Sequence, residues 1–411
     1  MEGRRERTES ERELERKRRR EQAVKKRRKL IAAMVLCLAL VVLAIVFVLR
    51  SCGNTSENSE DKGTTEENIT TEDSPSENEG EVQLDLGNGV GLVIEYEEPA
   101  MQELSFTVSL VGDCTLGTDT SYGTSGSFIE EYSLQTPDYF FAGVSDAFDN
   151  DDLTVVNLEG PLTDSTNKQD KTFAFKGDEE FTEILTEGSI EAVNLANNHS
   201  YDYGTEGFED TQNAVTAAGV TWFGYDETPV VEVNGIQVGL VGVYMLRLTD
   251  DQGKEALETR IQQAEDAGAE VIIVSFHWGS EYSYYPSASQ EMLAKYAIDL
   301  GADLVVGHHP HVLQGIDLYE GKYIVYSLGN FCFGGNRNPS DKDTIIFQQT
   351  FTVQNSEVEV NDDINIIPCS LSSVTTRNDY QPTILSGDAK DEVADKLQDI
   401  SMIDIMPYIS E

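Results

Sequence analysis

All five histidines of this chain lie just after short apolar runs, in segments that also contain carboxylate or amide side chains. A histidine taken alone is more often packed or solvated than bound to a metal. Five of them together with Asp113, Glu159 and Asn198 favour a metal site instead. In chain order the segments are Val111-Gly112-Asp113, Asn157-Leu158-Glu159-Gly160, Asn197-Asn198-His199, His277-Trp278-Gly279, Gly307-His308-His309-Pro310-His311 and Tyr326-Ser327-Leu328-Gly329-Asn330-Phe331.

Imidazole, carboxylate and amide oxygen form a mixed donor set, which suits divalent ions of the Zn, Mn and Fe(II) class. Thiolate ligands are not expected, because the cysteines at positions 37, 52, 114, 332 and 369 follow no zinc-binding spacing. They form no dense disulfide framework either, and a Cys332–Cys369 bridge stays open. Two ions roughly 3.5–4 Å apart, bridged by Glu159, would hold a phosphate ester, activate water and stabilise an in-line displacement. The sequence therefore predicts one or two divalent ions, without fixing their identity.

The elements that carry these side chains alternate between two periodicities. From Leu104 onward, short runs rich in Val, Ile and Leu alternate with stretches of helical spacing, which predicts one layered α/β (α+β) domain over residues 104–400. Because sites in such proteins form where strands end, the polar groups should meet at one edge. The expected strands are Ser105–Val111, Leu153–Asn157, Ala192–Ala196, Ile236–Val243, Val271–Phe276, Leu304–Val306, Tyr323–Tyr326 and Thr344–Val353. The expected helices are Glu180–Glu187, Glu206–Ala218, Glu255–Ala267, Ser289–Leu300 and Asp391–Ile400.

Charge divides the chain into two unlike parts. Of 29 Lys and Arg residues, 14 precede Leu30 beside 7 of the 74 acids, and Arg50 is one more; the remaining 14 basic and 67 acidic residues give about −53 after Arg50. Such an acidic domain is not expected to bind nucleic acid. Residues 30–49 carry no charge and no Pro, and 20 residues suffice to cross a bilayer core. The basic residues ahead of this span predict a cytoplasmic N-terminus, with the rest of the chain extracellular.

A single-pass membrane anchor is therefore preferred over a cleaved signal peptide, whose apolar stretch and basic leader would usually be shorter. It is also preferred over lipidation at Cys52, because Arg50 fits poorly in Leu49-Arg50-Ser51-Cys52. Residues 1–29 are expected to form a basic cytoplasmic tail. Residues 50–103 are expected to form an acidic, low-complexity and disordered linker, although Val82, Leu84 and Leu86 alternate as in a strand. Residues 401–411 are left as a C-terminal tail.

The segments GD, NLEGPLT, NLANNHSYDYG, FHWG, GHHPHVLQGI and YSLGNF, in this order, resemble the CapA family of poly-γ-glutamate capsule proteins. The resemblance covers about Leu104 to Phe333. It implies a fold similar to calcineurin-like metallophosphoesterases, a four-layer sandwich with two sheets between helices. Residue by residue it implies the metal ligands Asp113, Glu159, Asn198, His277, His309 and His311, with Glu159 bridging. It further implies His199 as general acid, with Asp202 as its orienting partner.

Two departures from the phosphoesterase pattern bear on the number of metal ions. The usual D-x-H motif has Thr115 in its third position, and Glu159 stands where an Asp is usual. Both weaken the case for a second ion. His308 is an alternative to His309 as the ligand paired with His311. Asn330 is as consistent with a strand-to-loop turn as with a substrate contact.

Three functions remain open on the sequence alone. The first is a membrane-anchored role in making or exporting an anionic capsule polymer such as poly-γ-glutamate. So acidic a domain should repel this polymer unless metal ions or a local basic patch intervene. The second is extracytoplasmic, metal-dependent hydrolysis of a phosphorylated small molecule or a polymer linkage. The third is a non-catalytic partnership with membrane synthase subunits.

Overall fold

The computed structural model describes residues 79–85, 91–97 and 103–410. The chain divides into two units, Met1–Ser76 and Glu77–Glu411, of which the first lies wholly outside the described residues. The predicted basic tail (1–29), the transmembrane helix (30–49) and the first part of the linker therefore lie outside them as well. Within the described ranges, no helix is both long enough and apolar enough to cross a bilayer.

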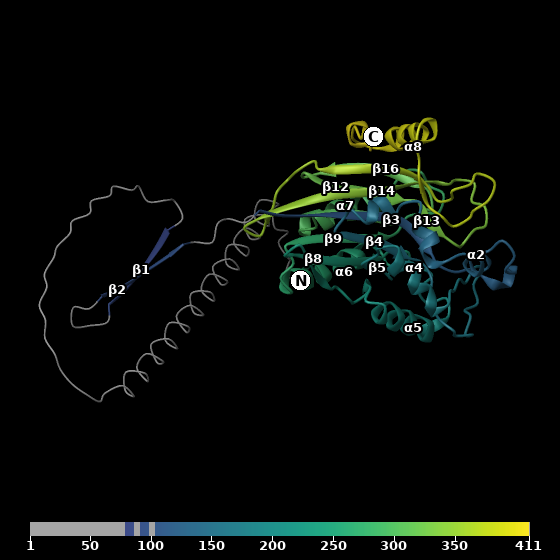
Figure 1. The fold of residues 1–411 in the computed structure, drawn as a ribbon, viewed down its shortest axis with the longest axis horizontal. Helices are drawn as coiled ribbons and strands as arrows, with labels where there is room; N and C mark the ends of the chain where they lie inside the picture. Colours follow the sequence, from purple (N-terminus) through teal and green to yellow (C-terminus); the bar gives the residue numbers. More distant parts are fainter. Residues whose placement is uncertain (1–78, 86–90, 98–102, 411) are drawn as a thin grey trace, which may run out of the picture. The chain divides into compact units, whose positions relative to one another are not determined.

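Two β-sheets form the centre of the second unit (Figure 1). Among the described residues the larger sheet has nine strands, seven of them in the order β17-β16-β14-β3-β4-β5-β6. The other two pair at its side, β13 with β3 and β15 with β14. The smaller sheet has the order β11-β12-β10-β9-β8-β7. The larger sheet consists of β3 (Glu103–Thr115), β4 (Leu153–Leu158), β5 (Ala192–Asn194), β6 (Thr221–Phe223), β13 (Asn330–Phe333), β14 (Asp343–Gln354), β15 (Glu357–Val358), β16 (Ile364–Ser370) and β17 (Thr383–Ile384). The smaller consists of β7 (Val230–Val233), β8 (Ile236–Tyr244), β9 (Val271–His277), β10 (Leu304–His308), β11 (Leu313–Tyr319) and β12 (Lys322–Leu328).

Helices cover the outer face of each sheet. The outer face of the smaller sheet packs against α6 (Asp250–Asp266) and α7 (Ala288–Leu300). Each of these helices begins with a capping box, Thr249 with Gln252 and Ser287 with Gln290, in which side chain and backbone satisfy the first N–H groups. The outer face of the larger sheet packs against α2 (Phe128–Leu134), α3 (Ser145–Phe148), α4 (Thr182–Glu187) and α5 (Gly204–Ala217).

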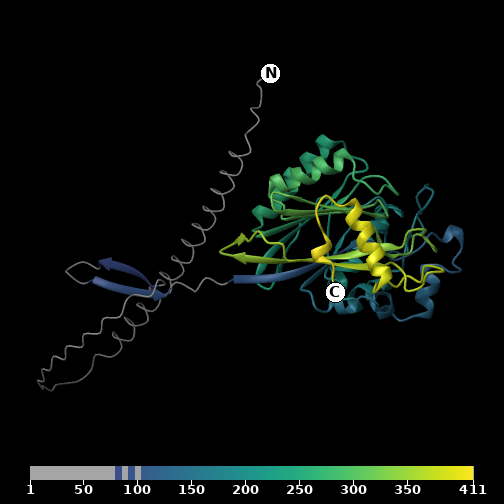
Figure 2. The same cartoon turned by 90° about the horizontal axis from the view of Figure 1, so that it is seen from above.

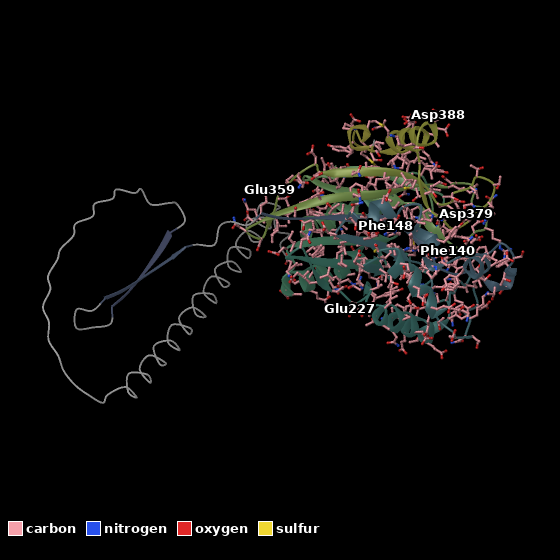
Figure 3. All side chains as sticks on the ribbon, in the orientation of Figure 1. Phe140, Phe148, Glu227, Glu359, Asp379 and Asp388 are labelled. Carbon is pink, nitrogen blue, oxygen red and sulfur yellow. The ribbon has the colours of Figure 1, made fainter. Side chains whose placement is uncertain are left out.

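Side chains alternate across each strand and so bind the layers together. On β9, Val271 and Ile273 lie in the core between the two sheets, whereas Ile272 and Val274 lie in the core under α6 and α7. Figure 3 shows how densely the layers are filled; Phe140 and Phe148 are buried under the larger sheet, while Glu227 and Asp388 are exposed. The order helix, sheet, sheet, helix confirms the predicted α/β class with layered helices.

The C-terminal helix α8 (Asp388–Ile400) lies across both sheets, packing against β11 and β16 (yellow in Figures 1 and 2). Its buried residues Val393, Leu397 and Ile400 belong to the core between the sheets. The predicted helix Asp391–Ile400 is therefore correct, although it begins earlier than expected, at Asp388.

The strands that precede the predicted ligands run parallel. In the larger sheet β3, β4 and β5 are parallel neighbours, and in the smaller sheet β8, β9 and β10 are. Parallel strands bring their carboxyl ends to one edge, where ligand sites form. Short 3₁₀ helices lie in the connections and near the C-terminus: η1 (Thr120–Tyr122), η2 (Pro137–Phe141), η3 (Glu179–Phe181) and η4 (Met406–Tyr408).

Part of the expected linker has regular structure. β1 (Glu79–Asp85) and β2 (Gly91–Glu97) form an antiparallel hairpin, in which Val82 lies opposite Ile94 and Leu84 opposite Leu92. The alternation at Val82 and Leu84 was thus a strand signal, and its missing partner is β2. Residues 79–85 and 91–97 are strands, which corrects the disordered reading of this part of the linker.

Candidate metal centre

The structure brings the predicted ligands together from both sheets. Asp113 lies near the end of β3, Glu159 follows β4, and Asn198 and His199 follow β5. His277 ends β9, while His309 and His311 lie in the turn between β10 and β11. Two glycines allow the strands to approach so closely: a Cβ at Gly112 would lie 2.2 Å from Gly329 O, and one at Gly307 would lie 2.0 Å from Tyr326 O.

The central feature of the site is the carboxylate of Glu159. Its side chain is fully buried, and neither Oε1 nor Oε2 has a hydrogen-bond partner. One ligand atom from each of Glu159, His309 and His311 lies within 4.8 Å of the others. An ionised carboxylate buried without partners is costly, so this cluster fits a cation, which would supply the missing contacts. The donor set of one carboxylate and two imidazoles suits a divalent ion of the Zn class.

Asp113, by contrast, is well supplied with partners. Asn157 Nδ2 donates to its Oδ1 at 2.8 Å, and the backbone N–H of His309 donates to its Oδ2 at 3.2 Å. His308 Nδ1 lies 3.5 Å from Oδ1, and His311 Nδ1 lies 3.2 Å from Oδ2. Asp113 therefore borders the Glu159, His309 and His311 cluster through His311.

The two candidate histidines before His311 occupy different places. His309 belongs to the cluster with Glu159, and its buried Nδ1 has no hydrogen-bond partner. His308 ends β10 and faces Asp113 instead; its Nδ1 is within ion-pair range but makes no hydrogen bond. His309 and His311 have φ values of 95° and 58°. Positive φ is strained for residues with a Cβ and is concentrated at functional sites.

His277 and Asn198 satisfy each other. His277 Nε2 lies 2.7 Å from Asn198 Oδ1, and because an amide oxygen only accepts, Nε2 carries the proton. His277 Nδ1 then accepts from Asn157 Nδ2 at 3.4 Å. Burial lowers the pKa of His277 well below its usual value, which agrees with this neutral ring. Glu159 Oε1 is 3.6 Å from the same Nε2.

Asn157 holds this arrangement in place, although no sequence pattern assigned it a role. Its Nδ2 contacts both Asp113 and His277, and its Oδ1 accepts from Asn194 Nδ2 at 3.0 Å. Asn197 Nδ2 donates to Leu158 O at 2.8 Å, and its Oδ1 accepts from the backbone N–H of His199 at 3.0 Å. A buried amide network of this kind can fix the orientation of metal-binding side chains without contacting the metal itself.

His199 and Asp202 form the predicted pair. His199 Nδ1 lies 2.7 Å from Asp202 Oδ2, and Nε2 lies 4.0 Å from Glu159 Oε1. Burial lowers the pKa of His199, although Asp202 opposes this. In the neutral ring Nδ1 carries the proton, so Nε2 is free to accept one. Proton donation by His199 would start from the charged ring.

Lys171 is a further residue at this pair that sequence patterns did not reveal. Its Nζ donates to Asp202 Oδ1 at 2.6 Å and to Asn198 O at 3.0 Å, and it lies 3.3 Å from His199 Nδ1. Asp202 also accepts from the backbone N–H of Phe175 at 2.7 Å. A lone lysine in a polar loop carries no pattern that would have identified it.

The pKa values of the acidic and histidine side chains in the site shift in different directions. Burial raises the pKa of Glu159 well above its usual value, and the charge of Asp113 adds to this. Burial opposes ionisation of Asp113 too, but His308 and His311 outweigh it and hold its pKa well below the usual range. For His311, burial is outweighed by Glu159 and Asp113, which raise its pKa to about 10. Burial lowers the pKa of His309 to about 4. This raised pKa favours a protonated His311, so a bound metal ion would have to compete with that proton.

The remaining predicted positions are structural or peripheral. Asn330 Oδ1 lies 2.8 Å from His311 Nδ1, and Asn330 Nδ2 donates to His311 O at 3.1 Å. Asn330 therefore holds the turn between β10 and β11 that carries His311. Trp278 is buried and donates to Tyr326 O. Cys114, Cys332 and Cys369 are all buried free thiols, so the structure contains no Cys332–Cys369 bridge.

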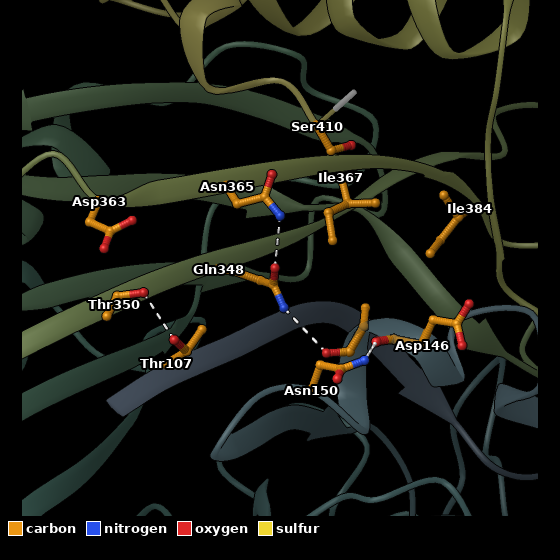
Figure 4. A pocket seen from close by; sticks show the side chains of 11 residues that line it. Thr107, Asp146, Asn150, Gln348, Thr350, Asp363, Asn365, Ile367, Ile384 and Ser410 are labelled. Atoms are coloured by element: carbon orange, nitrogen blue, oxygen red, sulfur yellow. Dashed lines mark hydrogen bonds between the residues drawn. The ribbon is translucent and has the colours of Figure 1, made fainter. Parts of the chain in front are cut away.

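A cavity of about 490 Å³ lies away from this centre (Figure 4). None of the predicted site residues lines it. Its walls are chiefly amide, hydroxyl and carboxylate side chains: Thr107, Asp146, Ala147, Asn150, Gln348, Thr350, Asp363, Asn365, Ile367, Ile384 and Ser410. Several of these side chains bond one another, as Asn365 does to Gln348 and Thr107 to Thr350.

Comparison with known proteins gives consistent matches over this domain. The family model described as "Bacterial capsule synthesis protein PGA_cap" matches residues 107–335. The capsule biosynthesis protein CapA of Bacillus anthracis is 36% identical over 252 residues, covering 55% of this chain and 59% of that protein. The PGA biosynthesis protein CapA of Bacillus subtilis is 32% identical over 254 residues, covering 55% and 63%.

More distant similarities extend the comparison. A probable polyglutamine synthesis accessory protein of Mycobacterium tuberculosis is 27% identical over 214 residues, covering 44% of this chain and 55% of that protein. The alignments with the two CapA proteins span about six tenths of their length. The crystal structure of TT1561 of Thermus thermophilus overlays 61% of this chain and 99% of its own, at 12% identity and a TM-score of 0.35, too slight a likeness to support an inference.

Proposed function

This chain belongs to the bacterial capsule synthesis protein family PGA_cap, whose model matches more than half of it, and on that basis we propose that it acts in making or exporting an anionic capsule polymer such as poly-γ-glutamate. The proposal includes a divalent metal site at the carboxyl ends of the parallel strands. Family membership is thus the basis of the proposal, and the role in making or exporting the polymer is what the proposal adds.

One observation carries the metal part of the proposal: both carboxylate oxygens of Glu159 are buried without hydrogen-bond partners beside His309 and His311. A bound cation would remove this penalty. Asp113 lies next to His311, and His277 with Asn198 lies next to Glu159. We therefore assign Glu159, His309 and His311 as the principal ligands, with Asp113, His277 and Asn198 as those that complete or extend the site.

A bound divalent ion would supply Lewis-acid activation of an ester, amide or phosphoryl oxygen and would favour ionisation of water. His199 would move a proton at the leaving oxygen through Nε2. Asp202 holds the opposite ring nitrogen, and Lys171 holds Asp202. This pair favours a second candidate function, metal-dependent hydrolysis of a phosphoester or polymer linkage outside the cell.

Localisation and partners complete the proposal. Residues 30–49 would anchor the chain in the cell membrane, with the N-terminus in the cytoplasm and the domain outside. The family membership suggests membrane synthase subunits as partners, which a non-catalytic role would also require.

The test is elemental analysis of the purified full-length chain, beside Asp113→Ala, His309→Ala and, as a control, the exposed Glu255→Gln. We expect near-stoichiometric transition metal in the wild type and the control, strongly reduced metal in His309→Ala and a smaller loss in Asp113→Ala. A phosphodiester assay on the same samples then separates the candidates. Metal-dependent turnover supports the hydrolase, and a folded wild type that binds no added metal overturns the metal site and leaves only a non-catalytic role.

A further inference from the structure

A row of aromatic rings leads from His199 to the protein surface. The ring centroids of His199 and Phe175 lie 4.5 Å apart, those of Phe175 and Phe173 6.3 Å, and those of Phe173 and Tyr122 5.5 Å. Phe175 is buried, but Phe173 and Tyr122 are 49% and 56% exposed. Two adjacent aromatic rings that stay half in water, next to a candidate centre, form a surface suited to a ligand.

Hydrogen bonds hold these exposed rings in position. Tyr122 Oη donates to Thr172 O at 3.0 Å, and the backbone N–H of Ala174 donates to Asp119 Oδ2 at 3.0 Å. Lys168 Nζ donates to Asp119 Oδ1 at 2.5 Å. The two loops that carry Tyr122 and Phe173 are thus tied together. A rigid surface loses little entropy when it binds a flexible chain.

Arg337 adds a positive charge to this surface. Its Nη2 donates to Tyr122 O at 3.0 Å and to Gly123 O at 2.5 Å. These described contacts are neutral carbonyl oxygens, whereas Lys168, Lys171 and Arg377 each contact a carboxylate. Two carbonyl bonds leave further N–H groups of the guanidinium for a ligand. Arg337 thus places a local positive charge on a chain whose net charge is −45.

We propose that Tyr122, Phe173 and Arg337, hereafter the arginine-aromatic face, bind the chain of a polycarboxylate polymer and direct it toward His199. The rings would pack against the methylene groups of the polymer, and Arg337 would pair with its carboxylates. This inference rests on the proposed function and adds to it a binding surface outside the metal centre. It also explains how so acidic a domain could hold a polyanion, because the attraction is local.

The experiment measures binding of a γ-linked glutamate decamer to the full-length chain by calorimetry, with a γ-linked glutamine decamer as the neutral probe. Phe173→Ala should weaken glutamate-decamer binding about ten-fold, and Arg337→Gln about five-fold with a smaller salt dependence. Lys254→Gln on α6 and Leu318→Ala on β11 are controls outside this face and should bind as the wild type does. Metal content, measured in every variant, should not change.

Each outcome decides between the two proposals. If the wild type binds the decamer and both variants bind it equally well, the arginine-aromatic face is wrong and the proposed function stands. If the wild type retains metal but prefers the neutral decamer or binds neither, the face and the poly-γ-glutamate substrate are both overturned. A wild type without metal refutes the metal centre alone, since decamer binding still tests the face.

Discussion

His277 Nε2 and Asn198 Oδ1 lie 2.7 Å apart, although 79 residues separate them in the sequence. Both were predicted as metal ligands, yet here each is the hydrogen-bond partner of the other. An ion bound by both would have to replace this bond and remove the Nε2 proton. The Glu159 carboxyl group beside His309 has no hydrogen bond that an ion would have to replace. The site therefore consists of a part that lacks hydrogen-bond partners and a part that already has them, and we expect the two to differ in metal affinity.

Removal of His277 should cost less metal affinity than removal of His309. His277→Ala leaves the Glu159, His309 and His311 cluster intact, whereas His309→Ala removes one of its three members. We expect a loss of about ten-fold for His277→Ala and roughly 100-fold or more for His309→Ala. Competition against a metal-sensitive dye measures both. Equal losses would show that the ion lies between both groups of residues.

Glu159→Gln should abolish metal binding and at the same time stabilise the metal-free protein. The substitution removes the cost of burying an ionisable carboxyl group whose oxygens have no partners, and it keeps the shape of the side chain. We expect a gain of about 1–2 kcal/mol in the free energy of unfolding without metal. Urea unfolding with and without Mn²⁺ or Zn²⁺ gives both quantities. If Glu159→Gln were less stable than the wild type without metal while Glu255→Gln was unchanged, the buried Glu159 carboxyl group would not be destabilising.

The backbone at position 309 predicts a difference between two substitutions that remove the same imidazole. His309 has a φ of 95°, which glycine adopts freely and alanine does not. His309→Gly should therefore be more stable than His309→Ala by about 1 kcal/mol, measured by urea unfolding in the absence of metal. Both should lose metal equally. A more stable alanine variant would show that the loop relaxes to negative φ when the ring is removed.

Lys171 should act through His199 and Asp202 if it positions them. Lys171→Met is expected to lower phosphodiesterase kcat about ten-fold in an otherwise wild-type chain and to have little further effect in His199→Ala. Lys171→Arg should restore part of the activity, since a guanidinium can also reach Asp202. Independent, multiplicative losses in the double variant would instead assign Lys171 a separate contact with the substrate.

Asp151 should make stability fall as pH rises. Burial raises its pKa to about 6, with Thr154 Oγ1 donating to its Oδ2 at 2.7 Å. Because the folded state holds this proton more tightly than the unfolded chain, the carboxyl group favours folding near pH 4 and loses that advantage up to about pH 6. After allowance for its partial exposure, we expect Asp151→Asn to gain about 1 kcal/mol relative to wild type between pH 4.5 and 7.5.

Urea unfolding at the two pH values measures this difference, with the exposed Asp138→Asn as the control. The comparison between wild type and variant removes the contribution of the many other carboxylates. An equal effect of Asp151→Asn at both pH values would mean that the group does not titrate in this range.

The fold class and most of its central elements follow from local patterns. Buried strands such as β8 and β9 are continuous apolar runs, and helices α6 and α7 carry capping residues and end at glycines, all of which can be seen within a few residues. Short strands such as β6, β13 and β17 were missed, because they exist only through pairing with strands from elsewhere in the chain. The hairpin β1–β2 was missed for a different reason: the alternation at Val82 and Leu84 was seen, but its neighbouring partner β2 was not identified.

From the sequence it was possible to predict which side chains would come together, because metal ligation restricts side-chain types and parallel strands place their carboxyl ends at one edge. The sequence could not determine which of them lack partners. That Glu159 is orphaned, that His277 and Asn198 satisfy each other, and that Lys171 reaches Asp202 are all consequences of loops and strands meeting across large sequence separations. Hydrogen-bond satisfaction is a property of the packed arrangement, so only the tertiary structure decides it.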